Sequence, residues 1–574
     1  MLSPISVPYG RMRAHCKVRS LLNPTSILTP GLSPASERPA GLKLINVHQD
    51  HIVEAPADCE YIALSYVFGS VTTINITRSN SFNRHSLPRT IRDALVACYE
   101  LGFKYFDPVD QLHQINQMSH IYECAAYTIV ALAGEDSSYG LPGVTKARSW
   151  NFKCITIGNT NITTLPPGPD FGITQSKWYT RGWKFQEAMF SSRLILFTSY
   201  GVHCCFRDKY GWLLSKSEYN TRDEAFKLPR PGDYWSALAQ YTTRDLTFPS
   251  DILRAFTAVL RSIYGDYTYY GLPFQEIDDA VLWAPNKVTS APTSKRHGFP
   301  SWSWASHCGP VSPPDDDRAA GLAIWALPPR GLGTAVTFCR PRQEQQWPNM
   351  WYSMSLYRMR LIASALFTGC LRSNIHLDAC LDTQACEQLF SRWPDYAAYW
   401  DDVFGQYRQE DIFSPVDIRT ASLGARILVH GQTAHFMVQP NLDYSSGSHC
   451  IHSMNGSLSG YVDILQYEVQ KSTRYVGEFI AISVAISHPF PFLSGRGGDD
   501  PEYEDYLRYR DDKSDLPEHM RQVLSNQGGL NFLLDVMLIK RDEHSNVGRR
   551  VGIGRICLRP WAESERRVKT IVLE

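Results

Sequence analysis

The chain lacks the features that would assign it at once to several common classes of protein. Its 57 Lys and Arg residues equal its 57 Asp and Glu residues, so there is no net positive field to hold a nucleic acid. The sequence contains no run of about eighteen apolar residues, and its first residues lack the apolar core of a signal peptide. We therefore expect a soluble cytoplasmic protein that has no membrane span and does not bind nucleic acid.

Common cysteine and catalytic signatures are also missing. None of the 14 cysteines forms a C-x-x-C pair, which argues against a zinc module and a disulfide framework. The densest group is His203, Cys204 and Cys205, and we interpret it as buried strand packing because adjacent strand residues point to opposite faces. The motifs G-x-S-x-G, H-E-x-x-H and G-x-x-x-x-G-K-[ST] are absent as well. No stock hydrolase, metalloprotease or nucleotide-triphosphatase site is indicated.

What is present is a chain of 574 residues, long enough for two to four domains at about 150 residues each. Pro and Ser dominate its beginning, strands and helices then alternate, and short alternating apolar stretches fill its second half. We expect a loose arm over 1–45, an α/β domain over 46–215, a helical extension over 216–320, and a mixed β-rich region over 321–574 with a charged loop at 495–515.

The alternation within the second segment predicts an α/β domain with a parallel sheet. YIALSYVFG at 61–69 and AYTIVALAG at 126–134 have the composition of buried strands. Between them, LPRTIRDALVACYELG predicts an amphipathic helix over 90–101, with Gly102 as its left-handed stop. Strands that alternate with helices favour parallel pairing.

One stretch, YFDPVDQLHQINQMSHIY at 105–122, leaves too little room for an inner strand. Apolar spacing predicts a helix from about Pro108, capped by Asp107, with Leu112, Ile115, Met118 and Tyr122 on its buried face. Only residues 103–106 then separate this helix from the preceding one, whereas a strand usually takes about five to six residues. The sequence predicts that the strand has shrunk to the stub FKYF.

The segment WYTRGWKFQEAMFSSR at 178–193 concentrates polar and aromatic residues. On a helix, Trp183, Gln186 and Glu187 share one face. That face offers an indole for stacking and a carboxylate for chemistry, and Arg181 offers a fork for phosphate. The alternative is that the tryptophans pack in the core and Arg181 pairs with Glu187, and spacing alone favours this alternative.

A second aromatic segment, RHGFPSWSWASHCGPV at 296–311, invites a carbohydrate-binding interpretation through Trp302 and Trp304. Alternation on a strand would put both indoles on one face, beneath a polar outer face. We therefore favour a core wall.

Together these segments resemble the heterokaryon-incompatibility domain of filamentous fungi. YIALSYVFG is similar to its first motif, with Phe68 where tryptophan is usual. LPRTIRDALVACYELGFKYF and HQINQMSHIYECAAYTIVALAG are similar to the second motif, and WYTRGWKFQEAMFSSRLILF to the third. FPSWSWA and GIGRICLRPW extend the resemblance, which is good from about 60 to 310.

The chain departs from the family at the stub. Family members continue from the tyrosine into a Leu-Trp-Val-Asp run and a Cys-Ile-Asp-Gln turn, whereas Phe106 here passes directly to DPVDQLHQINQM. The resemblance therefore implies the loss of most of a central strand and of its carboxyl-end loop. A gene-model error and a degenerate copy are the two explanations.

The resemblance implies a role in fungal non-self recognition and programmed cell death. The family domain is also similar to Toll/interleukin-1-receptor-like domains, some of which cleave NAD, so NAD is a candidate substrate while no cofactor or metal is expected. Glu187 would then be the catalytic carboxylate. The implied ligand-binding residues are Ser65, Tyr66, Gly69, Arg181, Trp183 and Gln186.

Three other interpretations stay open at this stage. The first is a non-enzymatic interaction module that binds other signalling proteins or itself. The second is an inactive paralogue, and the third is a sensor of a small ligand.

Overall fold

The structure is a computed structural model, and it divides into two compact units, Met1–Ile263 and Tyr264–Glu574. The finer four-part division expected from the sequence stays a prediction. The residues that the structure describes are 39–69, 82–107, 117–148, 154–164, 167–207, 212–217, 225–226, 234–286, 294–314, 318–327, 337–339, 367, 388, 391–393, 396–403, 424–440, 448–468, 474–486, 532–542 and 547–574.

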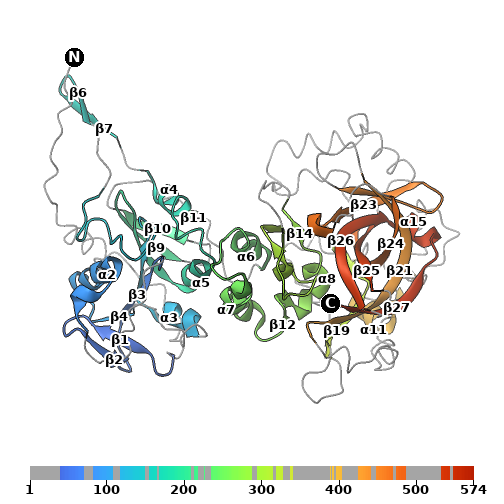
Figure 1. Cartoon of the computed structure of the whole chain (residues 1–574), viewed down its shortest axis with the longest axis horizontal. Helices are drawn as coiled ribbons and strands as arrows, with labels where there is room; N and C mark the ends of the chain where they lie inside the picture. The colour runs from blue at the N-terminus through green and yellow to red at the C-terminus, as the bar shows by residue number, and fades with distance from the viewer. Residues whose placement is uncertain are drawn as a thin grey trace. The chain divides into compact units, whose positions relative to one another are not determined.

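The first unit is built on a nine-stranded sheet (Figure 1). From edge to edge its strands are β11 (Ala225–Phe226), β10 (Trp212–Ser217), β9 (Val202–Arg207), β8 (Arg193–Phe197), β5 (Tyr127–Ala131), β3 (Tyr61–Ser65), β4 (Tyr105–Asp107), β1 (Lys43–Asn46) and β2 (His51–Glu54). The four central strands β8, β5, β3 and β4 are parallel, and the flanking pairs are antiparallel. The expected parallel sheet is therefore confirmed at the centre of a mixed sheet.

The central strands are mainly apolar and mostly buried because they are covered on both faces. Successive residues of β5 belong to two different cores: Ile129 packs in the cluster of Ile91 and Leu95, while Val130 packs in the cluster of Trp178. This alternation is the period of two expected of a strand. The sheet therefore has one core on each side, and helices supply side chains to both.

The first helix of the unit, α2 (Arg89–Glu100), begins and ends close to where the sequence predicts. The other helices described in this unit are α3 (Met118–Cys124), α4 (Pro169–Thr174), α5 (Gly182–Phe190), α6 (Tyr234–Tyr241) and α7 (Arg254–Tyr264), with the 3-10 turns η3 (Arg84–Ser86) and η5 (Pro249–Ile252). A separate hairpin joins β6 (Cys154–Ile157) to β7 (Thr160–Thr163). Gly102 has a φ of 86°, which confirms the left-handed stop after α2.

Helices α6 and α7 fix the position of α5 from behind. The Phe185 ring lies 5.6 Å from the ring of Tyr241, which stacks on Phe256 at 4.7 Å between centroids. All three rings are buried. Aromatic pairs at these separations add to area burial, so α5 is clamped between the sheet and the two following helices.

The shortened inner strand is present as β4, which runs from Tyr105 to Asp107 between β3 and β1. The strand therefore covers the last two residues of the predicted stub FKYF and the residue after it. Asp107 is the last residue of this strand and is buried, and the prediction that it caps a helix stays a prediction. Residues 108–116, where the start of that helix was expected, lie outside the described residues, and α3 begins at Met118.

A side chain completes the hydrogen bonding beyond the end of β4. The register pairs Ala63 with Asp107, so β3 extends past its partner at Leu64. The Tyr61 carbonyl accepts from Ala126 on the β5 side, and backbone alternation therefore turns the Leu64 carbonyl towards β4. There the Tyr122 hydroxyl donates to the Leu64 carbonyl at 3.0 Å. A tyrosine from α3 thus replaces a backbone donor.

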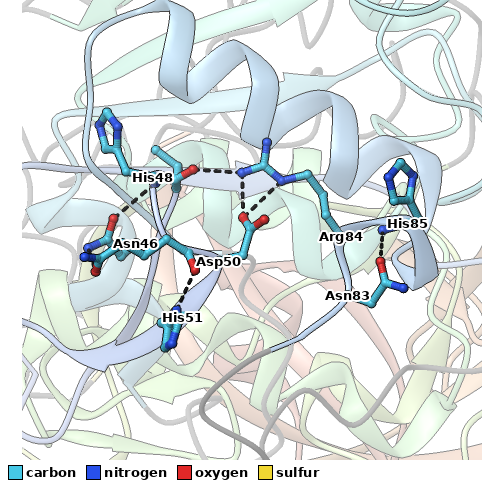
Figure 2. Close-up of polar contacts among 9 residues, drawn as sticks. Asn46, His48, Asp50, His51, Asn83, Arg84 and His85 are labelled. Carbon is cyan, nitrogen blue, oxygen red and sulfur yellow. Dashed lines mark hydrogen bonds and ion pairs between the residues drawn. The ribbon is translucent and has the colours of Figure 1, made fainter.

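The hairpin of β1 and β2, which sequence reasoning missed, is tied to η3 by one arginine (Figure 2). Arg84 Nη2 donates to Asp50 Oδ1 at 2.6 Å and to the Val47 carbonyl at 2.8 Å. Asp50 has a φ of 52°, a left-handed conformation that Asp and Asn tolerate better than other residues. The hairpin turn and η3 are therefore fastened together.

The loop after β5 is anchored to α2 by a buried carboxylate. Asp93 accepts from the Leu141 amide at 2.8 Å and from the Thr145 hydroxyl at 2.7 Å. Gly140 has a φ of 87°, and a Cβ there would lie 2.6 Å from Asp93 Oδ2. Only glycine fits at position 140.

The second unit confirms the expected β-rich C-terminal region (Figure 1). Six antiparallel strands form a closed ring, in which β21 (Ile427–Pro440) pairs with β24 (Tyr475–Ile486), then β25 (Phe532–Arg541), β26 (Val547–Cys557), β23 (Leu458–Ile464), β22 (His449–His452) and β21 again. The strand β27 (Arg567–Leu573) pairs with β21 and β26. The edge additions are β18 (Arg318–Gly321), β19 (Ile324–Leu327) and β20 (Thr337–Cys339).

Three aromatic rings meet within the mainly aliphatic core of this closed sheet. Phe436 stacks on Trp561 of α15 (Leu558–Glu563) at 5.8 Å and meets Phe479 edge-on at 6.1 Å. The remaining elements of the unit are short: β12 (Thr268–Tyr269), β13 (Leu272–Pro273), η6 (Phe274–Glu276), α8 (Ile277–Ala280), β14 (Ala284–Pro285), β15 (Ser294–Lys295), η7 (Trp304–Ser306), β16 (His307–Cys308), β17 (Val311–Ser312), α11 (Tyr396–Val403) and η11 (Gln466–Glu468).

The two tryptophans of the PSWSW segment are core residues, as predicted, but they do not lie on a strand. Trp304 begins η7, and Trp302 precedes it in a turn. Both indoles are buried, and Trp302 Nε1 donates to the Leu573 carbonyl at 3.2 Å. Because the two tryptophans lie in a turn, each indole nitrogen donates to a different buried carbonyl. The prediction that both indoles form one wall of the core on a strand is therefore wrong.

Candidate functional site

The candidate site lies where β3 and β5 end side by side. In a parallel sheet of order β4, β3, β5, β8, the chain leaves these two strands in opposite directions, which is the usual place for a ligand. The Ser137 amide donates to the Phe68 carbonyl at 3.4 Å, which joins the two loops. Gly69 has a φ of 73°, and a Cβ there would lie 2.4 Å from Asp136 Cβ. The turn at Gly69 therefore requires glycine.

Glu187 of α5 meets Ser65, the last residue of β3. Ser65 Oγ donates to Glu187 Oε2 at 2.5 Å, and Lys184 Nζ donates to Glu187 Oε1 at 2.6 Å. Glu187 is only 1% exposed. Both carboxylate oxygens are therefore engaged, one by a neutral donor and one by a cation.

A tryptophan orients the serine. Trp178 Nε1 donates to Ser65 Oγ at 2.6 Å, so the serine lone pair is occupied and its proton is directed to Glu187. The Trp178 indole, the Ser65 hydroxyl and the Glu187 carboxylate thus form a relay of two hydrogen bonds that ends on Glu187. Because α4, α5, β5 and β8 each contribute to the core around Trp178, this relay is held by packing.

Tyr122 lies near the Glu187 carboxylate. Burial raises the pKa of its phenol well above the usual value, and the nearby Glu187 and Asp107 raise it further. The hydroxyl therefore stays protonated and keeps its donor. Asp107, at the end of β4, contributes a second buried acidic side chain to this edge of the sheet.

Two aromatic rings hold the ammonium of Lys184. Its Nζ lies 4.7 Å from the centre of the Phe68 ring and 5.8 Å from that of Tyr66. The two rings meet edge to face at 4.8 Å. Phe68 is 42% exposed, whereas Tyr66 is buried. The Phe68 ring is therefore the part of this aromatic pair that is exposed to solvent.

The structure brings together some of the residues singled out from the sequence. Glu187, Ser65 and Tyr66 belong to one cluster, and Gly69 forms the exposed turn beside it. Gln186 is buried, and its Oε1 has no hydrogen-bond partner among the described residues. Trp183 is half-buried on the same helix.

Arg181 contacts a threonine rather than Glu187. It is the N-cap of α5, and its guanidinium donates to the Thr247 hydroxyl. The ion pair of Glu187 is made by Lys184, three residues earlier in the helix. Sequence reasoning missed Lys184 although its spacing of three was visible. Trp178 and Tyr122 were also missed, because their contacts depend on the tertiary fold.

The histidines and cysteines of the first unit do not form a metal site within the described residues. His203, Cys204 and Cys205 are buried in β9, as predicted. Burial, with a smaller effect from Arg148, lowers the pKa of His203 to about 4. The three histidines His48, His51 and His85 are exposed around the Asp50 and Arg84 pair (Figure 2).

Comparison with known families bears on the residues of this site. The family model described as "Heterokaryon incompatibility protein (HET)" matches residues 61–187, from the first residue of β3 to the carboxylate of α5. No curated protein and no solved structure matches the chain. Among the described residues, no helix is long and apolar enough to cross a membrane.

Proposed function

We propose that the domain over residues 61–187 triggers programmed death of fused fungal cells by cleaving NAD, with Glu187 as the catalytic carboxylate. The match of these residues to the heterokaryon incompatibility family supports a role in heterokaryon incompatibility. The observation that carries this proposal is the meeting of Ser65 and Glu187 at the carboxyl ends of parallel strands. The protein would act in the cytoplasm with other incompatibility proteins as partners.

The proposed chemistry is hydrolysis of the bond between nicotinamide and ribose. The electron pair of this bond leaves with the nicotinamide nitrogen, water adds to ribose C1′, and one proton is released. A positive charge develops on the ribose in the transition state, and the fixed carboxylate of Glu187 would stabilise it. Ser65 and Trp178 act as positioning residues, because their hydrogen bonds hold Oε2 in place.

The test is NAD consumption by the purified chain, compared with Glu187→Gln. We expect turnover to fall by about 10²-fold or more, as for the loss of one preorganised charge in other enzymes. Glu123→Gln is the matched control, because Glu123 is an exposed carboxylate on the neighbouring helix α3. Equal turnover in wild type and Glu187→Gln would remove Glu187 from the mechanism.

A second function, signalling by assembly without catalysis, is favoured by one observation. Glu187 is 1% exposed and its carboxylate is saturated by Ser65 and Lys184, which is also how a structural ion pair is built. The discriminating assay is expression in a fungal host. Cell death that is unchanged in Glu187→Gln would assign the domain to assembly, whereas survival of the cells supports NAD cleavage.

The short β4 raises the question of whether this chain can carry out the proposed NAD cleavage. Three residues form the strand, and the expected Trp-Val-Asp and Cys-Ile-Asp-Gln residues are not in the sequence. The transcript across codons 100–115 and its flanking genomic DNA test the two explanations. A retained in-frame block would identify a gene-model error, and its absence from both would support a degenerate copy. Robust NAD cleavage by the 574-residue chain would refute degeneracy.

A further inference from the structure

The Lys184 ammonium occupies a place that the surrounding residues build for a cation. The Glu187 carboxylate lies 2.6 Å from Nζ, and the Phe68 and Tyr66 rings face it at 4.7 and 5.8 Å. A carboxylate with aromatic faces within about 6 Å is the usual environment for organic cations in binding proteins. The Lys184 side chain is only 5% exposed, so these three groups surround its ammonium in place of water.

The site has one wall that a ligand can reach. Phe68 is 42% exposed, and it stands in the loop after β3 rather than in the core of the sheet. Lys184 reaches the site on a flexible four-carbon stem from α5, so its ammonium can leave while the helix stays clamped by Phe185. Glu187 has no such freedom, because Ser65 holds its other oxygen.

We propose that Glu187, Phe68 and Tyr66 form a binding site for a planar organic cation, and that Lys184 fills this site as a tethered internal ligand until the cation displaces it. The identity of the cation as the nicotinamide ring of oxidised NAD rests on the proposed function. That ring is flat and positively charged, so it can stack on Phe68 and face Glu187. The reduced, uncharged ring lacks the charge that this site selects.

The test uses two small probes that differ in charge. Binding of N1-methylnicotinamide, a cation, and of neutral nicotinamide is measured by calorimetry on the full chain and on Lys184→Met. Removing the competing ammonium should tighten binding of the cation by about tenfold or more, because a charge-assisted contact to Glu187 becomes available. Nicotinamide should bind both proteins equally. Lys177→Met, at an exposed lysine just before α5, is the matched control.

A thermal readout covers the case in which Lys184→Met loses stability. The cation should raise the melting temperature of Lys184→Met more than that of wild type, since it restores a positive charge beside Glu187. If that variant does not fold, Phe68→Leu in the otherwise wild-type chain decides. The Phe68 ring is partly exposed, so the variant should fold and bind the cation about threefold or more weakly.

The outcomes separate this inference from the proposed activity. Selective binding of the cation without NAD turnover would support the site while removing NAD cleavage. NAD turnover with equal binding of both probes, unchanged in Lys184→Met and in Phe68→Leu, would overturn the site while leaving Glu187 in the mechanism.

Discussion

Replacing Tyr122 with phenylalanine tests how the sheet tolerates its short inner strand. The change removes only the hydroxyl that donates to the Leu64 carbonyl at 3.0 Å. The described part of β4 ends opposite Ala63, and among the described residues the donor to the Leu64 carbonyl is the Tyr122 hydroxyl. A buried carbonyl left without a donor costs about 1 to 3 kcal/mol. The apolar packing of the ring is retained, so the loss of hydrogen bonding should account for the whole change.

The measurement is thermal unfolding together with hydrogen exchange of the β3 amides. A loss of 2 kcal/mol lowers the melting temperature by about 4 to 8 °C in a unit of this size. Tyr99→Phe is the control, because Tyr99 is 52% exposed and should change stability by less than about 0.5 kcal/mol. If Tyr122→Phe is as stable as the control, another group satisfies the Leu64 carbonyl and the compensation inferred here is wrong.

Three further perturbations have definite expected outcomes. Asp93→Ala should lower stability by about 2 to 4 kcal/mol in urea unfolding, because one buried and one part-buried hydrogen bond to the loop after β5 are lost. Gly140→Ala should also destabilise the protein, by about 1 to 3 kcal/mol, since a φ of 87° is strained for alanine and its Cβ would meet Asp93. An unchanged urea midpoint in either variant would contradict the prediction made for it. Burial lowers the pKa of His203 and His307 to about 4 each, so the folded state binds fewer protons than the unfolded state between pH 6.5 and 4. Stability should fall as the pH drops through that window, by about 1.4 kcal/mol per pH unit and histidine, and a flat profile would show that neither stays buried and neutral.

Local patterns predicted most of the central fold. The helix over 90–101, the strands at 61–69 and 126–134 and the left-handed Gly102 follow from periodicity and glycine chemistry, and the structure has them. The hairpin of β1 and β2 was missed, because its strands have four residues each and its fastening by Arg84 links distant parts of the sequence. The closed sheet of the second unit could not be predicted, since pairing order is not written in any single strand.

In the candidate site, too, contacts within one helix could be predicted from the sequence, and contacts between distant segments could not. Helix spacing put Trp183 on the same face as Glu187, and the same spacing would have indicated Lys184 at i−3. The hydrogen bond of Ser65 to Glu187 spans 122 positions and that of Trp178 to Ser65 spans 113, so no window of the sequence contains either. Arg181 was assigned to phosphate by type alone, and the fold gives it Thr247 as its contact.

The closed sheet of the second unit has a consequence for the order of folding. Strand β27 pairs with seven residues of β21, and Ser301 hydrogen-bonds to the Glu574 carbonyl, 273 positions away. Contacts between such distant positions form slowly, because a long loop must close before they contribute. At a synthesis rate of about 5 to 20 residues per second, the first unit has many seconds to fold before β27 exists. Until then the edges of β21 and β26 that await β27 are exposed to other strands, so chaperone dependence and aggregation during synthesis should concentrate in the second unit.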